Sequence, residues 1–178
     1  MSPDTAATRL KREEIIHLVA QHLVTRGFEN SGIRALAESV GISDRMLMYY
    51  FEKKEDLIAQ ALLLLAEGMT ASLDELIPQN RASVRQIVNA LTAIDNQNDL
   101  QRGVLMLWFE IIGLAVRGGD PYRATAKQIL EGYEAWIANK LPPDQKHRAT
   151  ETLAQIEGQI MLDLLAHPRE SDNIASPT

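Results

Sequence analysis

The sequence predicts an all-α protein of about eight or nine helices. Apolar side chains recur at helical spacing along nearly all of the 178 residues, and no segment convincingly shows the pattern of a strand. Apolar residues make up 46% of the chain and charged residues 24%, which is typical of a soluble globular protein that buries a core. Glycine and proline interrupt the helical pattern, so the limits of most helices can be predicted.

The first two helices are predicted from apolar spacing and from the glycines that follow them. Apolar residues keep the i, i+3, i+4 spacing over residues 9–26, and a glycine comes next. A second, short helix is expected over residues 33–40, with Ser31 or Gly32 as its N-cap. Gly41 can take the left-handed conformation that commonly ends a helix.

A third short helix and a long fourth helix follow. Ser43 is a suitable N-cap for a helix over residues 44–49, because its hydroxyl can accept a hydrogen bond from a backbone amide of the first turn. The fourth helix is expected over residues 54–76 and should end at Pro78. Its apolar stripe consists of Leu57, Ile58, Ala61, Leu62, Leu65, Met69, Leu73 and Leu76.

The middle of the chain continues in helices. A stripe over residues 84–94 is followed by the polar run 95–99, and residues 100–117 are apolar on nearly all sides, which indicates a helix packed against several neighbours. The most apolar part, residues 103–116, is 14 residues long and contains Glu110, whereas a membrane span needs about 20 residues. We therefore expect a buried helix there and no membrane span.

Proline residues mark the last two helices. Asp120 as N-cap and Pro121 as first helical residue predict the start of a helix that ends before Pro142. The last helix is expected over about residues 144–166. Residues 168–178 are small and polar, and they should form a flexible tail.

Charge and composition argue against several classes of protein and site. The chain has 18 basic and 24 acidic residues, and a net charge of -6 argues against a protein that coats nucleic acid through bulk positive charge. Without cysteine there is no disulfide, thiol nucleophile or cysteine-bound metal. The four histidines do not pair at metal-ligand spacing, and no phosphate-binding glycine loop or nucleophile elbow occurs. We therefore expect no enzyme activity, cofactor or metal. Residues 1–8 lack the apolar core of a signal peptide, so a cytoplasmic protein is expected.

The turn Gly41-Ile42-Ser43 joins the two short helices over residues 33–40 and 44–49, as a helix–turn–helix requires. Glycine takes a positive φ without steric cost, and this conformation lets the two helices cross steeply. In such a unit the first of the two helices braces against the sugar-phosphate backbone and the second enters the major groove. The apolar residues spaced to pack a small core with the first helix are Ala37, Val40, Ile42, Leu47 and Phe51.

Residues 27–57 resemble the DNA-binding segment of the TetR family of transcriptional regulators. The resemblance implies a helix–turn–helix DNA-binding domain over residues 1–53, an effector-binding and dimerisation domain over 54–167, and a flexible tail over 168–178. Beyond residue 76, only helical content and length support the match. The shared features, in the family's spacing, are Gly27-Phe28, Leu36-Ala37, Gly41-Ile42-Ser43, Tyr50-Phe51 and Lys54-Glu55-Asp56-Leu57.

Three positions depart from the family pattern. Gly32 stands where the family usually has threonine, so the hydroxyl that caps helix 33–40 must come from Ser31 or be missing. Arg45 stands where a small residue is usual, and Met48 where tyrosine is usual. Arg45 is either a solvated surface arginine or a base contact, and we favour the base contact because arginine can bind guanine O6 and N7 together.

Resemblance and side-chain chemistry together give two sets of DNA-contact candidates. Adjacent helical residues cannot both face the groove, so one of Tyr49 and Tyr50 should pack internally, and Tyr50 could pack beside Phe51. Residues 9–54 carry a net charge of +2, whereas the whole chain carries -6, so the remainder carries -8. Candidates for phosphate contact are Ser31, Arg34, Tyr49, Tyr50 and Lys54, and candidates for base-edge contact are Ser43, Arg45 and Met46.

The resemblance also implies a ligand cavity among the middle helices. For each candidate lining residue, ordinary core packing is the alternative. Glu110 either lies on a solvent-facing edge of its helix or is buried, where it must pair with a cation or occupy a polar hole. If it is buried, a cationic or hydrogen-bonding apolar ligand fits, with Trp108 available for a cation–π contact. The candidates are Leu62, Leu65, Met69, Leu91, Ile94, Met106, Trp108, Phe109, Glu110, Ile112 and Met161.

Two-fold dimers are the usual way for a helix–turn–helix protein to gain specificity, because a monomer makes few contacts. The resemblance implies an interface built from the last two helices. The alternative is that their main apolar stripe faces the protein's own core, although Ala154, Met161 and Leu165 offer a second face. The interface candidates are Ile129, Leu130, Tyr133, Ile137, Leu153, Ile156, Ile160 and Leu164.

These observations predict a ligand-responsive DNA-binding regulator of transcription. The favoured form is a homodimeric repressor that a small-molecule effector releases from a palindromic double-stranded operator. The alternative is an all-helical small-molecule carrier or enzyme that does not bind DNA.

Overall fold

The all-α prediction is confirmed by a computed structural model that describes residues 6–78, 81–93, 99–118 and 121–168. These residues form eight α-helices and two 3-10 helices, and no strand occurs among them. In chain order the elements are α1 Ala6–Arg26, η1 Phe28–Asn30, α2 Ile33–Val40, α3 Asp44–Tyr50, α4 Lys54–Leu76, α5 Val84–Thr92, α6 Asp99–Val116, α7 Tyr122–Lys140, η3 Pro143–Arg148 and α8 Ala149–Ala166.

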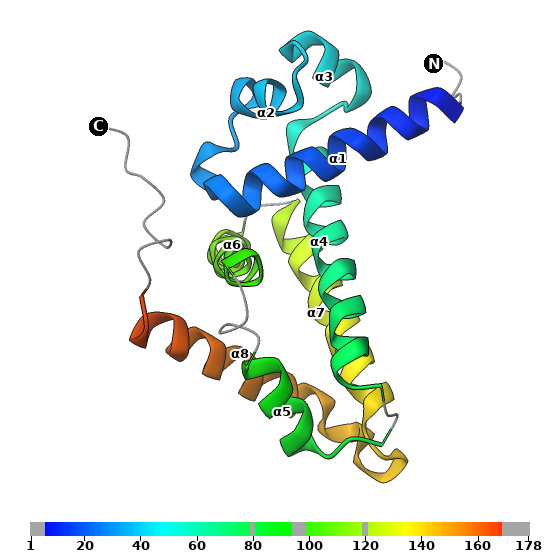
Figure 1. Cartoon of the computed structure of the whole chain (residues 1–178), viewed down its shortest axis with the longest axis vertical. Coiled ribbons are helices and arrows are strands. Elements are labelled where there is room, and N and C mark those ends of the chain that lie inside the picture. Colours follow the sequence, from blue (N-terminus) through cyan, green and yellow to red (C-terminus); the bar gives the residue numbers. More distant parts are fainter. Residues whose placement is uncertain (1–5, 79–80, 94–98, 119–120, 169–178) are drawn as a thin grey trace.

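The chain divides in space into a head, formed by α1, α2 and α3, and a body, formed by α4 to α8 (Figure 1). The long helix α4 begins beneath the head and runs down beside α7 to the opposite end of the body, where α5 and α8 lie (Figure 1). One continuous helix therefore connects the two parts.

The turn between α2 and α3 has the predicted conformation. Gly41 has φ 73° and ψ 29°, the left-handed conformation that commonly ends helices, and its amide donates to the carbonyl of Glu38. The amide of Ile42 donates to the carbonyl of Ala37 at 3.1 Å. The Ser43 hydroxyl accepts a hydrogen bond from the Met46 amide at 3.3 Å and so caps α3, as predicted.

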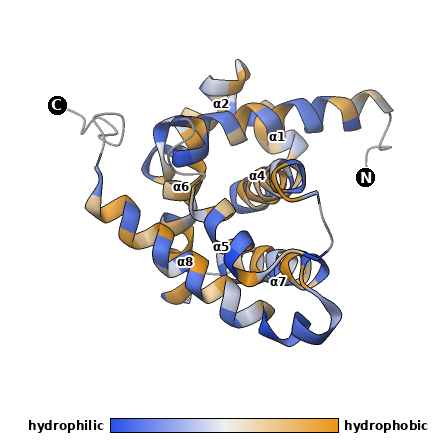
Figure 2. Cartoon of the chain, turned by 60° about the horizontal axis from the view of Figure 1, so that its bottom comes forward, coloured by the Kyte–Doolittle hydropathy of each residue, from blue (hydrophilic) through white to orange (hydrophobic). Residues whose placement is uncertain are grey.

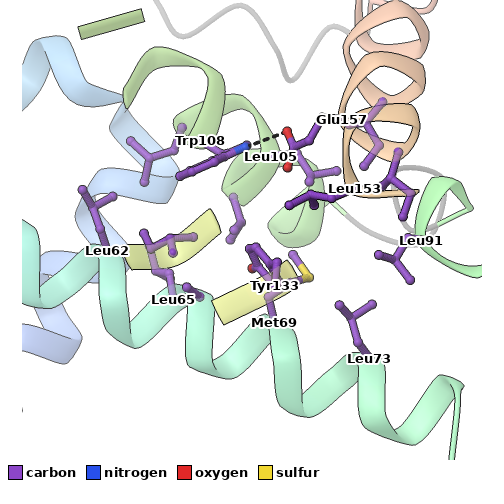
Figure 3. Close-up of a pocket in the computed structure, with 16 residues that line it drawn as sticks. Leu62, Leu65, Met69, Leu73, Leu91, Leu105, Trp108, Tyr133, Leu153 and Glu157 are labelled. Atoms are coloured by element: carbon purple, nitrogen blue, oxygen red, sulfur yellow. Dashed lines mark hydrogen bonds between the residues drawn. The ribbon is translucent and has the colours of Figure 1, made fainter. Parts of the chain in front are cut away.

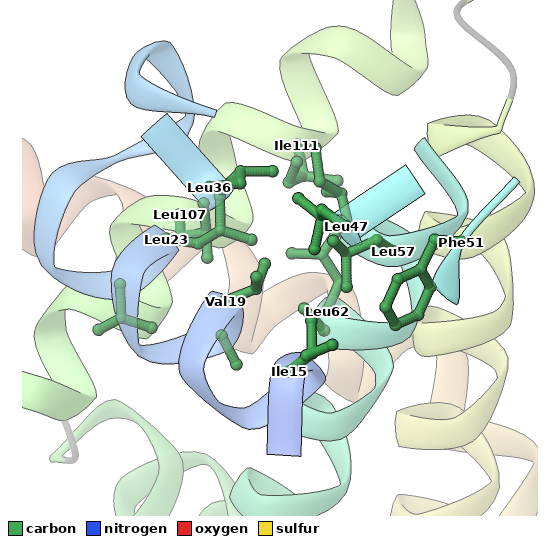
Figure 4. Close-up of a cluster of buried hydrophobic side chains, with 14 of the residues drawn as sticks. Ile15, Val19, Leu23, Leu36, Leu47, Phe51, Leu57, Leu62, Leu107 and Ile111 are labelled. Carbon is green, nitrogen blue, oxygen red and sulfur yellow. The ribbon is translucent and has the colours of Figure 1, made fainter. Parts of the chain in front are cut away.

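A first core cluster holds the head together and joins it to the body (Figure 4). It takes Leu36 from α2 and Leu47 from α3, and both side chains are fully buried. Because Leu107 and Ile111 of α6 belong to the same cluster, the head shares its core with the body. The labelled members are Ile15, Val19, Leu23, Leu36, Leu47, Phe51, Leu57, Leu62, Leu107 and Ile111.

A second core cluster fills the far end of the body, where α4, α5, α7 and α8 meet (Figure 2). A polar group braces its edge: Asp74 accepts hydrogen bonds from Lys140 Nζ at 2.7 Å and from Trp136 Nε1 at 2.8 Å. These contacts tie the end of α4 to the end of α7. The buried apolar members are Leu73, Ile77, Ala82, Ile87, Val88, Leu91, Trp136, Ile137, Leu141, Ala149, Leu153, Ile156 and Ile160.

Several predicted element limits are wrong by a few residues. Pro121 precedes α7 as its N-cap, whereas it was expected to be the first helical residue, and Asp120 lies outside the described residues. The last helix does not begin at residue 144, because Pro143–Arg148 forms the 3-10 helix η3 before α8 starts. Leu76 is 44% exposed, so the apolar stripe of α4 packs only as far as Leu73. The tail 169–178 lies outside the described residues.

Among the described helices, α4 alone is long and apolar enough to cross a membrane by length and composition. Within the fold it contacts both α1 and α7, and five of its side chains are buried. Core helices of soluble proteins meet the same criteria, so this finding alone does not indicate that α4 spans a membrane. The apolar helix α6 was not expected to span a membrane, and it does not meet these criteria.

Candidate nucleic-acid interface and internal cavity

Helix α3 presents most of its side chains to solvent. Leu47 is fully buried in the first core cluster and fixes the helix, while Arg45, Met46 and Met48 are exposed around it. Tyr49 is 62% exposed. A short helix with one buried anchor and several exposed polar and apolar side chains is suited to insertion into a groove.

The structure distinguishes between the two adjacent tyrosines. Tyr50 is partly buried against the first core cluster, and Tyr49 projects outward with its ring edge-to-face against Tyr50, at 5.4 Å between centroids. One tyrosine therefore packs while its neighbour stays free to contact a ligand. Phe51 beside them is buried, and the guanidinium of Arg12 lies 4.9 Å from the centre of its ring.

The other candidate DNA contacts lie on the outer side of the head, with one exception. Arg34 on α2 and Ser43 before α3 are exposed, and Lys54 is partly buried in the first turn of α4. Ser31 is only 4% exposed, which argues against the predicted contact of its side chain with phosphate. Ser31 lies in the turn after η1 and donates its amide to the carbonyl of Phe28 at 3.0 Å.

Helix α2 lacks the side-chain cap that most helices of this kind would have. Gly32 is its N-cap, in an extended conformation with φ −62°, and no side chain accepts a hydrogen bond there. Of the two alternatives left by the sequence, the missing cap is the one observed.

A cavity of about 70 Å³ lies inside the body, bordered by α4 on one side and by α5, α6, α7 and α8 on the others (Figure 3). Its wall is almost entirely apolar. The lining residues are Leu62, Leu65, Ala66, Met69, Leu73, Leu91, Val104, Leu105, Leu107, Trp108, Ile129, Tyr133, Leu153, Ile156, Glu157 and Ile160.

Glu157 brings a carboxylate to this apolar wall. Its Oε2 accepts a hydrogen bond from Trp108 Nε1 at 2.8 Å, drawn as a dashed line in Figure 3. Burial raises the pKa of Glu157 above its ordinary value, and the Trp108 hydrogen bond only partly opposes this effect. Burial also raises the pKa of Tyr133, with a smaller contribution from the charge of Glu157. The Tyr133 phenol is therefore neutral at physiological pH.

Five of the predicted ligand-binding residues border this cavity, and their contact with a ligand stays a prediction. Leu62, Leu65, Met69, Leu91 and Trp108 line it. Phe109, Ile112 and Met161 do not, because they lie on faces of α6 and α8 that point elsewhere, and Met161 is exposed. Ile94 lies outside the described residues.

Met106 and Glu110 do not line the cavity, because their face of α6 points toward α1, where they border a separate hollow beside Leu23 and Gly27. Glu110 is partly buried, and its Oε2 accepts a hydrogen bond from the Phe28 amide at 2.8 Å. The carboxylate thus occupies a polar niche at the junction of head and body. The Phe28 ring packs edge-to-face on Tyr122, at 5.2 Å between centroids.

The predicted dimer stripe faces the protein's own core instead of solvent. Ile129, Tyr133, Leu153, Ile156 and Ile160 line the cavity. Ile137 is fully buried, while Leu130 and Leu164 are partly buried against the second core cluster. Five of these eight residues are buried in the single chain, and Leu130, Tyr133 and Leu164 are partly buried, which favours the alternative interpretation that the stripe faces the protein's own core. The exposed apolar side chains on α8 are Met161, Leu162 and Leu165.

Sequence reasoning missed Glu157 as a cavity residue and assigned Tyr133 to a different site. A signal for Glu157 existed: it directly follows Ile156 and precedes Ile160 by three positions, so it borders the apolar face of α8. Among the described residues, no group of three or more His, Asp or Glu side chains could hold a metal ion.

Comparison with known proteins agrees with the geometry of the head. The family "Bacterial regulatory proteins, tetR family" matches residues 15–61, which run from α1 into α4. The HTH-type transcriptional regulator PksA of Bacillus subtilis (strain 168) is 23% identical over 128 residues. This match covers 72% of the present chain and 62% of PksA, so the chain matches about six-tenths of the length of that relative.

Solved structures share the fold over nearly the whole chain. A transcriptional regulator from Rhodococcus sp. Rha1 has a TM-score of 0.70 at 18% identity, covering 88% of this chain and 84% of that one. The multidrug binding protein EbrR complexed with proflavin has a TM-score of 0.70 at 20% identity, covering 92% and 95%. A protein from Saccharomonospora viridis in complex with choline has a TM-score of 0.68 at 17% identity, covering 93% and 92%.

The helix–turn–helix geometry of α2 and α3, the family match over residues 15–61 and the shared fold of the body agree with one another. Residues 15–61 are therefore similar to the DNA-binding part of the tetR family of bacterial regulatory proteins, and the rest of the chain shares the fold of these solved structures.

Proposed function

We propose that the protein is a homodimeric repressor that binds a palindromic DNA operator through α3 and is released when a small molecule enters the cavity of the body. The observation that carries this proposal is the path of α4. Its first turn, separated from the end of α3 by three residues, holds Lys54, and its later turns line the cavity with Leu62, Leu65 and Met69. One helix therefore contacts both proposed sites.

The proposed DNA contacts follow from exposure and chemistry. Arg45 would bind the edge of a guanine through O6 and N7, with Ser43 and Met46 beside it on base edges. The phosphate contacts would come from Arg34 on α2, the outward-pointing Tyr49 on α3 and Lys54 in the first turn of α4, whereas Tyr50 packs against the first core cluster. The net charge of +2 on residues 9–54 supports this orientation, since the rest of the chain carries -8 and would be repelled by DNA.

The proposed release mechanism needs only a small movement. Two recognition helices on a palindrome must match half-sites about 34–36 Å apart, so a shift of a few ångströms weakens binding. A ligand between α4 and α8 would tilt α4 and with it the head. The Glu110 carboxylate accepts a hydrogen bond from the Phe28 amide at 2.8 Å and so offers a second connection from α6 to the head.

The dimer is proposed to form through the exposed apolar side of α8, in place of the residues that the sequence indicated. Met161, Leu162 and Leu165 lie on that side and are exposed in the single chain. We propose that residues 1–53 form the DNA-binding domain and residues 54–167 the effector domain. The two domains share the first core cluster. The operator of a bacterial regulator is in the cytoplasm, and we place the protein there.

Small-molecule control is supported by two similar structures, which hold proflavin and choline. The apolar cavity of the present chain lies where a ligand would contact α4.

The DNA face is tested by titrating DNA from upstream of the protein's own gene and following fluorescence anisotropy. Arg45→Ala should cost about 1–3 kcal/mol on the preferred sequence and relax the choice of base at one position. Lys54→Ala should weaken binding to all DNA sequences alike. It should also reduce the slope of log affinity against log salt concentration by about one, because one phosphate contact is lost. Arg85→Ala on α5 is the matched control, because this exposed arginine lies at the opposite end of the molecule.

Unchanged operator binding by both head variants, with unchanged melting temperatures, would show that the assigned face is wrong. If the wild-type protein shows no salt-dependent DNA binding at all, the alternative of a helical carrier or enzyme is favoured.

A further inference from the structure

The cavity wall carries one charge. Among the described residues that line it, Glu157 is the only one with an ionisable acidic or basic side chain other than the Tyr133 phenol. Trp108 and Tyr133 supply aromatic surface, and the remaining lining residues are aliphatic or methionine. A pocket that needed only apolar contacts would be built without an acid, because burying a carboxylate is costly.

Glu157 lacks a cationic partner within the described part of the chain. The residues beside it on α8, Ile156 and Ile160, are buried, and its hydrogen-bond donor is the neutral Trp108 indole at 2.8 Å. An ionised carboxylate can accept about four hydrogen bonds, so this contact leaves most of its capacity unused. By contrast, Asp74, at the far end of the body, is paired with Lys140 at 2.7 Å.

We propose that the cavity selects a compact organic cation, such as a quaternary ammonium with a small apolar group, and that Glu157 supplies its counter-charge. The faces of Trp108 and Tyr133 would attract the same charge by cation–π interaction. The aliphatic wall contributed by α4 would hold the apolar group. This inference names the ligand class of the effector site and so rests on the proposed function for its regulatory meaning.

Other ligand classes fit the site less well. An anion would face the Glu157 carboxylate without any basic lining residue to hold it. A neutral apolar molecule would fill the volume but leave the acid without a partner. A large ligand would have to displace packed helices, since the cavity measures about 70 Å³.

The proposal is tested with two molecules of the same shape. Phenyltrimethylammonium is a permanent cation, and tert-butylbenzene is its neutral counterpart with carbon in place of nitrogen. Isothermal titration calorimetry of the full chain should give an affinity at least about tenfold higher for the cation, because a cation–π contact and a buried counter-charge both favour it. No DNA is present in this experiment.

The Glu157→Gln variant isolates the charge. Its amide oxygen can still accept the Trp108 hydrogen bond and its shape is the same, so the fold should persist. The cation should lose at least about tenfold in affinity, while tert-butylbenzene binds equally or more tightly. Glu151→Gln is the control: this residue lies on the same helix, is exposed, and removes the same formal charge from the chain. Its affinities should equal those of the wild type.

Equal affinity of the wild-type protein for the two molecules would overturn the inference, and so would failure of both to bind. Should Glu157→Gln unfold, Trp108→Phe provides the second test, since it keeps a ring but removes the indole donor. It should weaken the cation more than the neutral molecule, and equal losses would contradict the proposal. If the protein binds operator DNA but does not prefer the cation, only this inference is contradicted. If it binds the cation but no operator DNA, the proposed function is contradicted instead.

Discussion

Asp74 and Glu157 both accept a hydrogen bond from a tryptophan indole at 2.8 Å, yet their pKa values move in opposite directions. Hydrogen bonds from Lys140 and Trp136 lower the pKa of Asp74, whereas burial raises the pKa of Glu157. The two acids differ in their charged neighbours. Lys140 provides Asp74 with a positive charge, and no described side chain does so for Glu157. We infer that Asp74 stabilises the fold and that Glu157 is retained for a ligand.

We expect Asp74→Asn to lower the melting temperature at pH 7 and to lower it by a smaller amount at pH 3. A carboxylate with a lowered pKa contributes stability above its ordinary value of about 3.8, and that contribution is lost as the pH falls through the lowered value. The variant also leaves the buried Lys140 ammonium without its carboxylate. Circular dichroism melts at the two pH values measure the difference.

Glu75→Gln serves as the control for this prediction, because Glu75 is the next residue on α4 and is exposed. If Asp74→Asn melts like Glu75→Gln at pH 7, the bracing role of Asp74 is wrong.

The two acids at the junction and in the cavity show what the sequence could predict at this scale. Glu110 interrupts an apolar run, so a polar niche or a solvent-facing edge could be predicted for it. The identity of its partner, the Phe28 amide 82 positions away, depends on how α6 packs against the head. Glu157 was missed because acids commonly border an apolar face at solvent, and the hydrogen bond from Trp108 of α6 that holds this one at the cavity depends on the tertiary fold.

At the scale of elements, Gly41 tests how far one turn defines the head. We expect Gly41→Ala to destabilise the protein by about 1–2 kcal/mol, because alanine is strained at φ 73°. A Cβ would meet nothing within 4 Å there, so the loss would be conformational and not steric. Chemical denaturation measures it.

Gly32→Ala is the matched control, since Gly32 has φ −62° and equally open surroundings. Equal stability of the two variants would show that the left-handed turn is unimportant for the stability of the head.

The crossing of α1 and α6 depends on Gly103. A Cβ on this residue would lie 2.9 Å from both Cγ1 and the carbonyl oxygen of Val24, closer than real contacts allow. Gly103→Ala should therefore push α6 away from α1 and cost about 1–3 kcal/mol. Gly113→Ala, on the same helix with nothing within 4 Å, should instead stabilise by about 0.5–1 kcal/mol.

Denaturant titrations of the two variants compare them directly. The free energy of unfolding should fall in Gly103→Ala and rise in Gly113→Ala. If both variants are destabilised equally, the close contact between Gly103 and Val24 is not the cause.

Helix limits were predictable where the stop is local. The limits of α2 and α4 agree with the prediction at both ends, because glycine, a turn or proline flanks them. The start of α8 was not predictable in the same way, since residues 143–148 are compatible with either an α-helix or a 3-10 helix. Their conformation is decided by contacts with α7 and α8 that sequence spacing does not reveal.

At the scale of the whole molecule, the apolar stripes of α7 and α8 show the main limit of sequence reasoning. Helical periodicity correctly placed Ile137 on the apolar stripe of α7, and Ile156 and Ile160 on that of α8. Periodicity could not say whether a partner chain or the same chain covers these residues, because an apolar stripe looks the same in the sequence in either case. Only the closure of the body around the cavity decides that they are core, and this leaves other residues of α8 for a partner.

The exposed side of α8 is therefore where we expect two copies of the chain to meet. Leu165 is 75% exposed and Leu162 is 62% exposed, an unfavourable arrangement for a single chain but a useful one for a two-fold contact. Leu165→Glu would place two carboxylates in the proposed contact, one from each copy, so sedimentation should show the mass of a monomer. Operator affinity should fall together with the dimer, since a single head contacts one half-site.

Val116→Glu is the control, because Val116 is 73% exposed on α6, away from the proposed contact. It should leave both the mass and the operator affinity unchanged. The melting temperature of the Leu165→Glu protein should depend less on concentration than that of the wild type, because unfolding no longer separates two chains. A Leu165→Glu protein that still sediments as a dimer would place the interface elsewhere on the body, and the proposed spacing of the two α3 helices would then have to be derived from that other contact.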